Sequence, residues 1–575
     1  MERRVLLAVL LSFVVLYGYQ AIFPPPPPPA FEAPDPAGPP SATEPSGRRP
    51  ADPESPPDPA APAVEAAKPT LAAAAEQDIV VESAEVRAVF TTRGATLKSW
   101  RLKNYRDGGG APLELVATAV PNAVRPFNLG IDDDDAGEVL REALFKPSAE
   151  NLAVTSGEST LSFEYRDAAG LVATKHFTFD SAKPYVIGFS ADVSRNGTPL
   201  NARIYWGPSL GSGVIGGGMM YNPPPQPLFY RDGEATRIGI DDEDVGQPRV
   251  EEGTFRFIGV DDHYFLSAAL DANARVEYRP RRLPVEDTSS GLQFIDWSIQ
   301  YADGPRGAQF FFGPKDFGAL RAVSPELTYA IDFGIFRWMV VPLLNALKWV
   351  HGYLGNYGWS IIALTIIINL VIFPLRHKSV VSMRRMQELQ PEVKAIQDRY
   401  AKLKMSDPAR QKMNVELMNL YRERGVNPAS GCVPMLLTFP VLFAFYSMLS
   451  VAIEIRGAPF VGWITDLSVY DPLFIWPVIM GVTMVVQQKM TPAASMDPMQ
   501  QRMMMFMPII FSVMLAWAPS GLVLYWTASN LWTIGQQAVT NKLIGPPPQH
   551  SVRPPAERRL KSAGGGKSAQ AKERR

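Results

Sequence analysis

The sequence is poor in cysteine and histidine. Its 575 residues include one cysteine, Cys432, and five histidines. A single cysteine excludes any intrachain disulfide framework, and its apolar surroundings predict a buried structural thiol. The histidines are scattered and none has the spacing of a metal site. We therefore predict that the protein holds no metal and no cofactor.

Motifs of nucleophilic catalysis and of nucleotide binding are also missing. The sequence has no serine hydrolase elbow, P-loop or dinucleotide fingerprint. The acidic clusters 132–135 and 241–244 lack the residue spacing of a calcium loop, so we interpret them as solvated loops. We predict that the protein is not an enzyme. An envelope enzyme acting on a sugar is an alternative, and it would depend on His176 and His263.

Charge is distributed unevenly along a chain whose net charge is only -1. Acidic residues outnumber basic ones between Glu76 and Arg321, whereas basic residues predominate from Arg376 to Arg424 and from Asn541 onward. Such blocks of opposite sign indicate segments in different surroundings.

The N-terminal part predicts a membrane anchor followed by a tether. Residues 1–23 form an apolar run of about 19 residues after a short basic start, longer than the core of a signal peptide. No small-residue cleavage site follows closely, so we predict an uncleaved transmembrane anchor. Residues 24–75 are rich in Pro and Ala and hold few large apolar residues, which predicts a disordered, partly extended linker.

Residues 76–325 predict a large all-β domain. Short runs rich in β-branched and aromatic residues, such as IVVESAEVRAVF and STLSFEYRD, alternate with turn residues such as Asn196-Gly197. Many short strands at regular spacing favour a β-sandwich. Residues 326–350 then predict an amphipathic helix lying in the membrane interface. The alternative for that segment is a membrane span made irregular by Pro342.

The stretch from Asn356 to Leu375 is long and apolar enough to cross a bilayer, which takes about 20 residues. It carries Thr365 and Asn369 one helical turn apart, so both side chains share a face. A polar amide inside a span is costly in lipid and should face a partner, a cavity or water. We expect this face to be functional.

Residues 376–427 predict a helical hairpin in the cytoplasm. Apolar residues recur at spacings of three and four with charges between them, residues 405–408 supply a turn, and Gly425 ends the second helix. Four basic residues would surround the cytoplasmic mouth of the membrane part: Arg376, Lys378, Arg384 and Arg385. We expect the hairpin to be mobile and to contact partners.

Further apolar segments predict four more spans. They are 432–452, 472–488 and a stretch from Met503 to Ala538 that divides at Pro519-Ser520-Gly521. With the anchor, the total is six spans, five of them in a core of residues 351–540. Six spans place both termini, the hairpin and the basic tail 541–575 in the cytoplasm, as the positive-inside rule requires.

Polar residues inside these spans predict a shared hydrophilic groove. Any one of them could simply bond to a neighbouring helix. Together they would suit a passing polypeptide better than a specific ion, because no acidic residue lies in the middle of a span. The predicted groove residues are Thr365, Asn369, Thr438, Thr483, Gln487, Ser512, Thr527, Asn530 and Thr533.

Several segments resemble the YidC/Oxa/Albino family of membrane protein insertases. The membrane part carries the resemblance in GNYGWSIIALT, VNPASGCVPMLLTFPVLFAFYSML, APFVGWITDLSVYDP, DPMQQRMMMFMPIIF and PSGLVLYWTASNLWTIGQQ. The β domain resembles the family more weakly, in FTTRGATLKSW, DDHYFLSA and FFGPKDFGAL. The large domain and the anchor are similar to the Gram-negative form of the family.

The resemblance implies a fold and a mechanism. It implies a β-supersandwich in the periplasm, and five core helices around a positively charged groove that is open to cytoplasm and lipid. A nascent membrane protein would place its polar segment in the groove while its apolar segment moves into the bilayer. The protein would work in the bacterial inner membrane, alone or with the Sec translocon, without nucleotide hydrolysis and without binding DNA.

Two residues depart from the family pattern. The second span of the family usually carries an arginine or lysine where this chain has Asn369. We therefore expect the groove to work mainly by hydrogen bonding and hydration, with the basic mouth attracting acidic segments. Trp526 stands where the family commonly has a tyrosine. We include Trp526 in the predicted groove, but without a hydroxyl role.

The basic tail is a candidate for ribosome binding, because contacts to RNA phosphates are electrostatic. Its basic residues include Arg558, Arg559, Lys561, Arg574 and Arg575. The alternative is that the tail serves only as a topology signal. A different class of function is also open: a transporter or channel with an extracytoplasmic β sensor domain, although no internal repeat supports it.

Overall fold

The computed structural model describes residues 68–544, apart from short gaps. The gaps are 108, 119, 121–122, 132–133, 211–213, 216–223, 241–243, 286–287, 401–408, 426–432 and 491–497. The predicted anchor, the linker up to residue 67, the turn at 405–408, Cys432 and the tail from 545 onward therefore lie outside the described residues.

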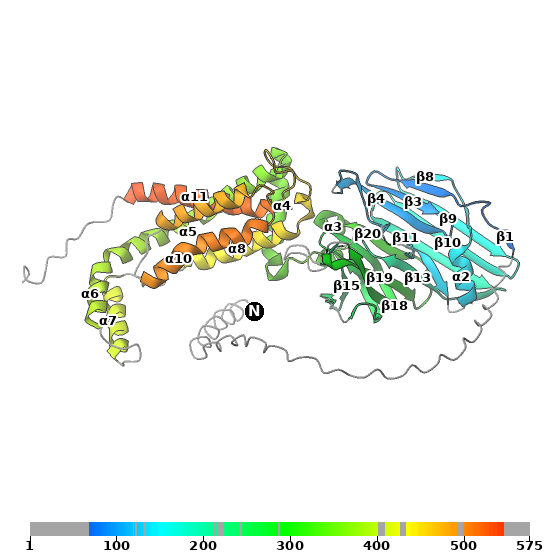
Figure 1. Ribbon diagram of the computed structural model, residues 1–575, viewed down its shortest axis with the longest axis horizontal. Coiled ribbons are helices and arrows are strands. Elements are labelled where there is room, and N and C mark those ends of the chain that lie inside the picture. Colours follow the sequence, from blue (N-terminus) through cyan, green and yellow to red (C-terminus); the bar gives the residue numbers. More distant parts are fainter. Residues whose placement is uncertain are drawn as a thin grey trace, which may run out of the picture. The chain divides into compact units, whose positions relative to one another are not determined.

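The β domain contains one large antiparallel sheet (Figure 1). Its strand order is β1 (Pro69–Leu71), β9 (Glu158–Asp167), β10 (Leu171–Asp180), β11 (Val186–Arg195), β20 (Ala308–Pro314), β18 (Phe265–Val285), β17 (Arg249–Asp261), β15 (Gln226–Arg231) and β16 (Glu234–Arg237). The strands that pair off this path are β6 (Asn128–Ile131), β7 (Lys146–Pro147), β12 (Thr198–Leu200), β13 (Ala202–Pro208), β14 (Val214–Ile215) and β19 (Thr288–Tyr301).

A second, smaller sheet completes the domain. Its order is β5 (Pro112–Glu114), β4 (Thr96–Arg106), β3 (Val86–Thr91), β2 (Asp78–Glu82) and β8 (Asn151–Ala153). Helix α2 (Asp134–Glu142) precedes β7, and helix α3 (Phe317–Val323) follows β20. The predicted all-β domain is thus present as a sandwich.

Strands such as β9 and β10 alternate between buried and more exposed residues, and their buried side chains form part of the core between the two sheets. In β10, each odd-numbered residue from Leu171 to Phe179 is buried and each even-numbered one is partly exposed. A period of two is what a half-buried strand requires. Trp100 of β4 links the sheets, because its Nε1 donates to the Phe312 carbonyl of β20 (2.9 Å).

The linker prediction needs one correction at its end. Residues 69–71 form β1, which pairs with β9. The Pro- and Ala-rich composition predicts a linker to residue 75 and does not predict this strand. The strand forms because β9 supplies hydrogen-bond partners for the backbone of residues 69–71. The predicted interfacial segment contains two 3₁₀ turns, η2 (Glu326–Ala330) and η3 (Gly334–Phe336), followed by α4 (Arg337–Leu354).

The rest of the described chain is helical. Its helices are α5 (Tyr357–Glu388), α6 (Gln390–Tyr400), α7 (Ala409–Glu423), α8 (Val433–Val451), α9 (Ile475–Met490), α10 (Pro498–Met514) and α11 (Ser520–Ile544), with η5 (Ile453–Ile455) and η6 (Leu515–Trp517) between them. The α-helix is interrupted between Met514, where α10 ends, and Ser520, where α11 begins. This interruption is close to the break predicted at Pro519-Ser520-Gly521. Val393 of α6 and Leu389 just before it pack against Leu417 and Leu420 of α7.

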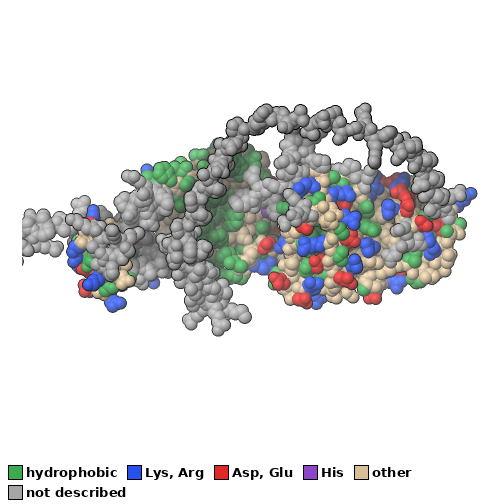
Figure 2. Space-filling model, turned by 60° about the horizontal axis from the view of Figure 1, so that its bottom comes forward, with side chains coloured by type: hydrophobic (Ala, Val, Ile, Leu, Met, Phe, Trp, Pro, Cys, Tyr) green, Lys and Arg blue, Asp and Glu red, His purple; other side chains and the backbone are tan. Residues whose placement is uncertain are grey.

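Length and composition alone single out one membrane-crossing helix among the described residues, Tyr357–Lys378. Phe439–Val451 and Met505–Trp517 are apolar but shorter. The distribution of hydrophobic and charged side chains on the surface also differs between the helical part and the β domain. Figure 2 shows hydrophobic side chains gathered on the helical part, whereas acidic and basic side chains are spread over the β domain.

Two loops of the β domain contact the helices. His263, in the loop between β17 and β18, donates from Nε2 to the Ser450 carbonyl of α8 (2.7 Å). At the N-terminus of α3, Asp316 accepts a hydrogen bond from Lys348 Nζ of α4 (3.2 Å), and the same Nζ contacts Glu454 of η5 (3.3 Å). We call Asp316, Lys348 and Glu454 the junction triad.

Candidate functional site

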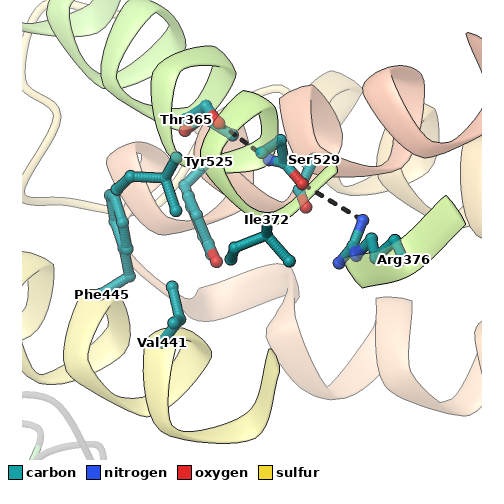
Figure 3. A pocket seen from close by; sticks show the side chains of 9 residues that line it. Thr365, Ile372, Arg376, Val441, Phe445, Tyr525 and Ser529 are labelled. Atoms are coloured by element: carbon teal, nitrogen blue, oxygen red, sulfur yellow. Dashed lines mark hydrogen bonds between the residues drawn. The ribbon is translucent and has the colours of Figure 1, made fainter. Parts of the chain in front are cut away.

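A small pocket lies between helices α5, α8 and α11. Its lining is partly polar and partly apolar, and Figure 3 shows its side chains. Its cavity volume is about 10 Å³, within a partly solvent-open space of about 250 Å³ between the lining side chains. The lining residues are Thr365, Ile368, Asn369, Ile372, Arg376, Val441, Phe445, Tyr525 and Ser529.

Helix α5 supplies the pocket from one continuous face. Thr365, Asn369, Ile372 and Arg376 are separated by four, three and four residues, which is the spacing of one face of an α-helix. Thr365 and Asn369 are buried, and Arg376 is half-buried. Helix α11 adds Tyr525 and Ser529, again one turn apart.

Local hydrogen bonds fix the polar groups of α5. Thr365 Oγ1 donates to the Ile361 carbonyl (2.6 Å), and Asn369 Nδ2 donates to the Thr365 carbonyl (2.8 Å). Both bonds return to the preceding turn of the same helix, so neither residue needs a partner from another helix. With its amide nitrogen engaged, Asn369 turns its Oδ1 toward the C-terminal half of α5.

Arg376 reaches back to that oxygen. Its Nη1 donates to Asn369 Oδ1 (3.2 Å) and to Thr533 Oγ1 of α11 (3.1 Å). The two residues of α5 are seven positions apart, so their backbones differ by about 10 Å along the axis. The Cα–Cβ bonds of a helix tilt toward its N-terminus, which gives the side chain of Arg376 this direction.

The structure places Arg376, predicted for the cytoplasmic mouth, in the lining of the same pocket as the predicted groove residues Thr365 and Asn369. A groove that works mainly by hydrogen bonding and hydration stays a prediction. Among the other predicted mouth residues, Lys378 and Arg385 are exposed. The side chain of Arg384 lies outside what the structure describes.

Aromatic rings close the other side of the pocket. The rings of Phe445 and Tyr525 stack with centroids 4.3 Å apart and planes 9° from parallel. In Figure 3 they lie opposite Arg376, with Ile372 between. A stacked aromatic wall facing a cation gives the pocket one apolar side and one charged side.

Most of the other predicted groove residues bond between or within helices. Asn530 Nδ2 donates to Thr483 Oγ1 (3.1 Å), which joins α11 to α9, and Ser512 Oγ donates to the Pro477 carbonyl (2.7 Å), which joins α10 to α9. Thr527 donates to the Val523 carbonyl of its own helix (2.8 Å). Such contacts are an ordinary use of polar groups between packed helices.

Three predicted residues remain. Gln487 is half-buried on α9, and the side chain of Thr438 lies outside the described residues. Trp526 packs its ring on Phe511 of α10, with centroids 5.1 Å apart. The pocket instead uses the neighbouring Tyr525. Its spacing of four and eight residues from Ser529 and Thr533 is the signal that could have identified it.

His176 and His263, on which the alternative of an envelope enzyme depends, make separate contacts in the described residues. His176 Nδ1 hydrogen-bonds with Ser162 Oγ between β10 and β9 (2.8 Å), whereas His263 contacts α8. Within the described residues, no group of three or more His, Cys, Asp or Glu side chains is arranged to hold a metal ion.

Two family models match the chain. The model described as "60Kd inner membrane protein" matches residues 349–546, and the model described as "YidC periplasmic domain" matches residues 78–346. The first range contains the pocket, and the second contains the β-sandwich except β1.

Full-length relatives agree. The membrane protein insertase YidC of Geobacter metallireducens is 37% identical over 572 residues, which cover 95% of this chain and 99% of that protein. The protein of the same name from Geotalea daltonii is 35% identical over 558 residues, with 95% and 100% covered.

Among solved structures, an active YidC insertase with its first transmembrane domain resolved matches 83% of this chain and 95% of its own, with 18% identity and a TM-score of 0.33. A putative mutarotase from Salmonella typhimurium matches 40% of this chain and 88% of its own, with 13% identity and a TM-score of 0.27. On the sequence relatives and family models, this chain belongs to the YidC family of membrane protein insertases, inner membrane proteins with a periplasmic domain.

Proposed function

We propose that the pocket between α5, α8 and α11 receives the polar segment of a membrane protein during insertion, while the apolar segment moves into lipid. A polar group alone in hydrocarbon costs several kcal/mol, roughly, so a segment that must cross needs partners inside the membrane. Asn369, Thr533 and Arg376 supply amide, hydroxyl and guanidinium groups at that depth.

The guanidinium of Arg376 in the pocket is the observation that carries this proposal. A charge within a span is expensive and usually functional. Here the charge lies inside the helix bundle, against Asn369 and Thr533. It attracts carboxylates of an incoming segment more strongly than it would in water, because the surrounding helices lower the local dielectric constant.

The size of the pocket limits how a segment enters. One turn of an α-helix with its side chains occupies about 400 Å³, from a diameter of about 10 Å and a pitch of 5.4 Å. The cavity volume of the pocket is about 10 Å³, which is room for about one water molecule. We infer that α8 moves away from α5 and α11 when the polar segment enters.

The apolar outer faces of α9 and α10 provide the path for the apolar segment. Val478 and Val482 of α9 are exposed, as are Phe506, Ile510 and Val513 of α10. Such a surface is stable only in contact with lipid or with another apolar helix. Burial of about 20 apolar residues in lipid then drives insertion, without a covalent step, a nucleotide or a cofactor.

We further propose that the chain crosses the membrane six times, through residues 1–23 and helices α5, α8, α9, α10 and α11. Helix α5 alone satisfies the length and composition of a span among the described residues. Helix α11 has the length, but its polar residues lower its hydropathy. The distribution of Lys and Arg supports cytoplasmic termini and a cytoplasmic α6–α7 hairpin.

Ribosomes and the Sec translocon are the proposed partners besides nascent membrane proteins and the lipid bilayer. The basic tail 541–575 would bind RNA phosphates, with the hairpin as a second contact. Deletion of the tail should abolish pelleting of the protein with ribosomes. Binding that persists unchanged at high salt would contradict an electrostatic contact. The comparisons lend no support to the alternative of a transporter or channel.

Photocrosslinking from paired positions tests the pocket. A photoreactive residue would replace Ile372 or Ser529, which line the pocket, or Val371 or Leu531, which are exposed on the same two helices. The substrate would be a stalled ribosome–nascent chain with an acidic polar segment before one apolar segment.

We expect the polar segment to crosslink from the pocket positions, and the apolar segment from the exposed positions. Equal crosslinking of the polar segment from all four positions would refute the proposed route. Crosslinks from none of them, with the chain folded and in the membrane, would refute it as well.

A further inference from the structure

The pocket obtains its charge from an unusual place in the sequence. Arg376 lies at the end of the apolar stretch, two residues before the limit of the candidate span. Arginines near the ends of spans usually extend outward and keep their heads in water. This one extends inward and meets Asn369, whose backbone lies about two turns away and which departs from the family pattern.

We propose that Asn369 is a positioning residue that fixes the guanidinium of Arg376 in the pocket, so that the groove keeps a cation although position 369 carries none. The inference rests on the proposed function of the pocket. In this inference, Asn369 determines the direction in which the Arg376 side chain extends.

The contacts of Asn369 suit this role. Its Nδ2 is held by the Thr365 carbonyl, which leaves Oδ1 directed at Arg376. A neutral acceptor can orient a cation without cancelling its charge, whereas a carboxylate at the same place would neutralise it. Thr533 holds the same nitrogen from α11, and its own hydroxyl donates to the Ser529 carbonyl (2.8 Å).

A purely structural role is the competing explanation. Arg376 joins α5 to α11 through Thr533, and loss of such a bond could simply loosen the two helices. A loosened bundle would insert every substrate less well. A misplaced cation would instead affect substrates according to their charge. The ratio of insertion rates for two substrates that differ only in charge separates the two cases.

The experiment uses the full-length protein in liposomes and one pair of substrates. The first substrate carries two Asp residues in the segment that crosses, and the second carries Asn at the same two positions. Four variants are compared with the unchanged protein: Asn369→Leu, Asn369→Asp, Arg376→Gln and the transposed double variant Asn369→Arg with Arg376→Asn. Thermal unfolding of each purified variant shows that it is folded.

The variants should separate by the charge they leave in the pocket. We expect Arg376→Gln and Asn369→Asp to lower the acidic-to-neutral rate ratio about tenfold. The first variant removes the cation and the second pairs it with a carboxylate. Asn369→Leu should lower the ratio to an intermediate value. The transposed variant should restore the ratio, because it returns a cation to the pocket from position 369.

Other outcomes would overturn the inference. If Arg376→Gln lowers the ratio but both Asn369 variants leave it unchanged, Asn369 does not position the cation and the proposed function still stands. If the variants slow both substrates equally, the contact is structural. If Arg376→Gln leaves the ratio unchanged, the charge of the pocket has no part in insertion, and the proposed function loses its main support.

Discussion

The junction triad should make the contact between the β domain and the helices depend on pH through Glu454. The Glu454 side chain is only 6% exposed and shares Lys348 with Asp316. Burial, followed by the nearby Asp316, raises the pKa of Glu454 from 4.5 to about 7. The pKa of Asp316 is lowered: burial alone would raise it, but the Ala319 amide and Lys348 outweigh burial. One lysine thus faces two carboxyl groups that compete for it.

The size and sign of the pH effect on junction stability follow from the difference in the pKa of Glu454 between the open and the closed junction. A raised pKa in the closed junction means that closure binds a proton. Its contribution is therefore complete below pH 4.5 and is lost as pH rises to about 7. The difference between 4.5 and about 7 in the pKa of Glu454 corresponds to about 3 kcal/mol. Asp316 titrates below this window, and Lys348, whose pKa is raised by Glu454 and Asp316 despite burial, titrates above it.

His263 acts in the opposite direction within the same window. Burial, with help from Lys315, lowers the pKa of His263 from 6.5 to about 4. The contribution of its neutral form is complete above pH 6.5 and is lost as pH falls to about 4. The two groups largely cancel between pH 4.5 and 6.5, so the unchanged protein should show a nearly flat profile there. The effect of Glu454 is therefore measured as the difference in junction stability between a Glu454 variant and the unchanged protein.

Hydrogen exchange of the α3 amides, measured in lipid nanodiscs from pH 5 to 8, reports opening of the junction. Protection in Glu454→Gln divided by protection in the unchanged protein should rise by a factor on the order of 100 across this range. The same ratio for Glu150→Gln, an exposed residue of the β domain, should stay constant. A constant ratio for Glu454→Gln would refute the reasoning, because Glu454 would then be charged throughout.

Further predictions concern other parts of the molecule. Burial lowers the pKa of Lys175 to about 7, yet its Nζ donates to the carbonyls of Gly94, Ala95 and Phe127. Lys175→Met should therefore destabilise the β domain by about 3 kcal/mol in thermal unfolding, whereas Lys146→Met, on the surface, should be neutral. Gly207 has φ of +74°, and an added Cβ would lie 1.8 Å from the Val124 carbonyl oxygen. Gly207→Ala should cost more than 2 kcal/mol, roughly, against about 1 kcal/mol for Gly157→Ala, where φ is +64° but nothing lies within 4 Å. On the hairpin, Arg424 and Glu392 form an exposed ion pair. Because such pairs contribute about 0–1 kcal/mol, Arg424→Gln should change the helix content measured by circular dichroism only marginally.

Sequence patterns predicted the parts of the fold that depend on period and punctuation. The alternation of strands such as β10 and the break before α11 are both properties of short windows of sequence. The shared face of Thr365 and Asn369 is another such property. Strand β1 could not be anticipated in the same way, because three residues of a proline-rich segment become a strand only when β9 lies beside them.

The site was harder to predict because helical spacing fixes a face but not the direction of a long side chain. Arg376 follows the apolar stretch and was assigned to the mouth. Its inward direction depends on acceptors at Asn369 and on Thr533 of another helix. Tyr525 was missed for a related reason. Adjacent residues of a helix differ by about 100° in direction, so Tyr525 lines the pocket while the predicted Trp526 packs on Phe511.

Two of the three β-domain segments that resemble the family supply the contacts to the helices. DDHYFLSA contains His263, which contacts α8, and FFGPKDFGAL contains Asp316, which contacts α4. The interior of a β-sandwich accepts many apolar side chains of suitable volume, whereas a hydrogen bond to a defined carbonyl or ammonium group accepts few. We therefore predict that disruption of the Asp316 and His263 contacts affects insertion more than changes on the outer surface of the β domain, because these contacts join the domain to defined groups of the helices. Insertion rates of Asp316→Asn and of a surface variant such as Glu150→Gln would test this, and equal rates would contradict it.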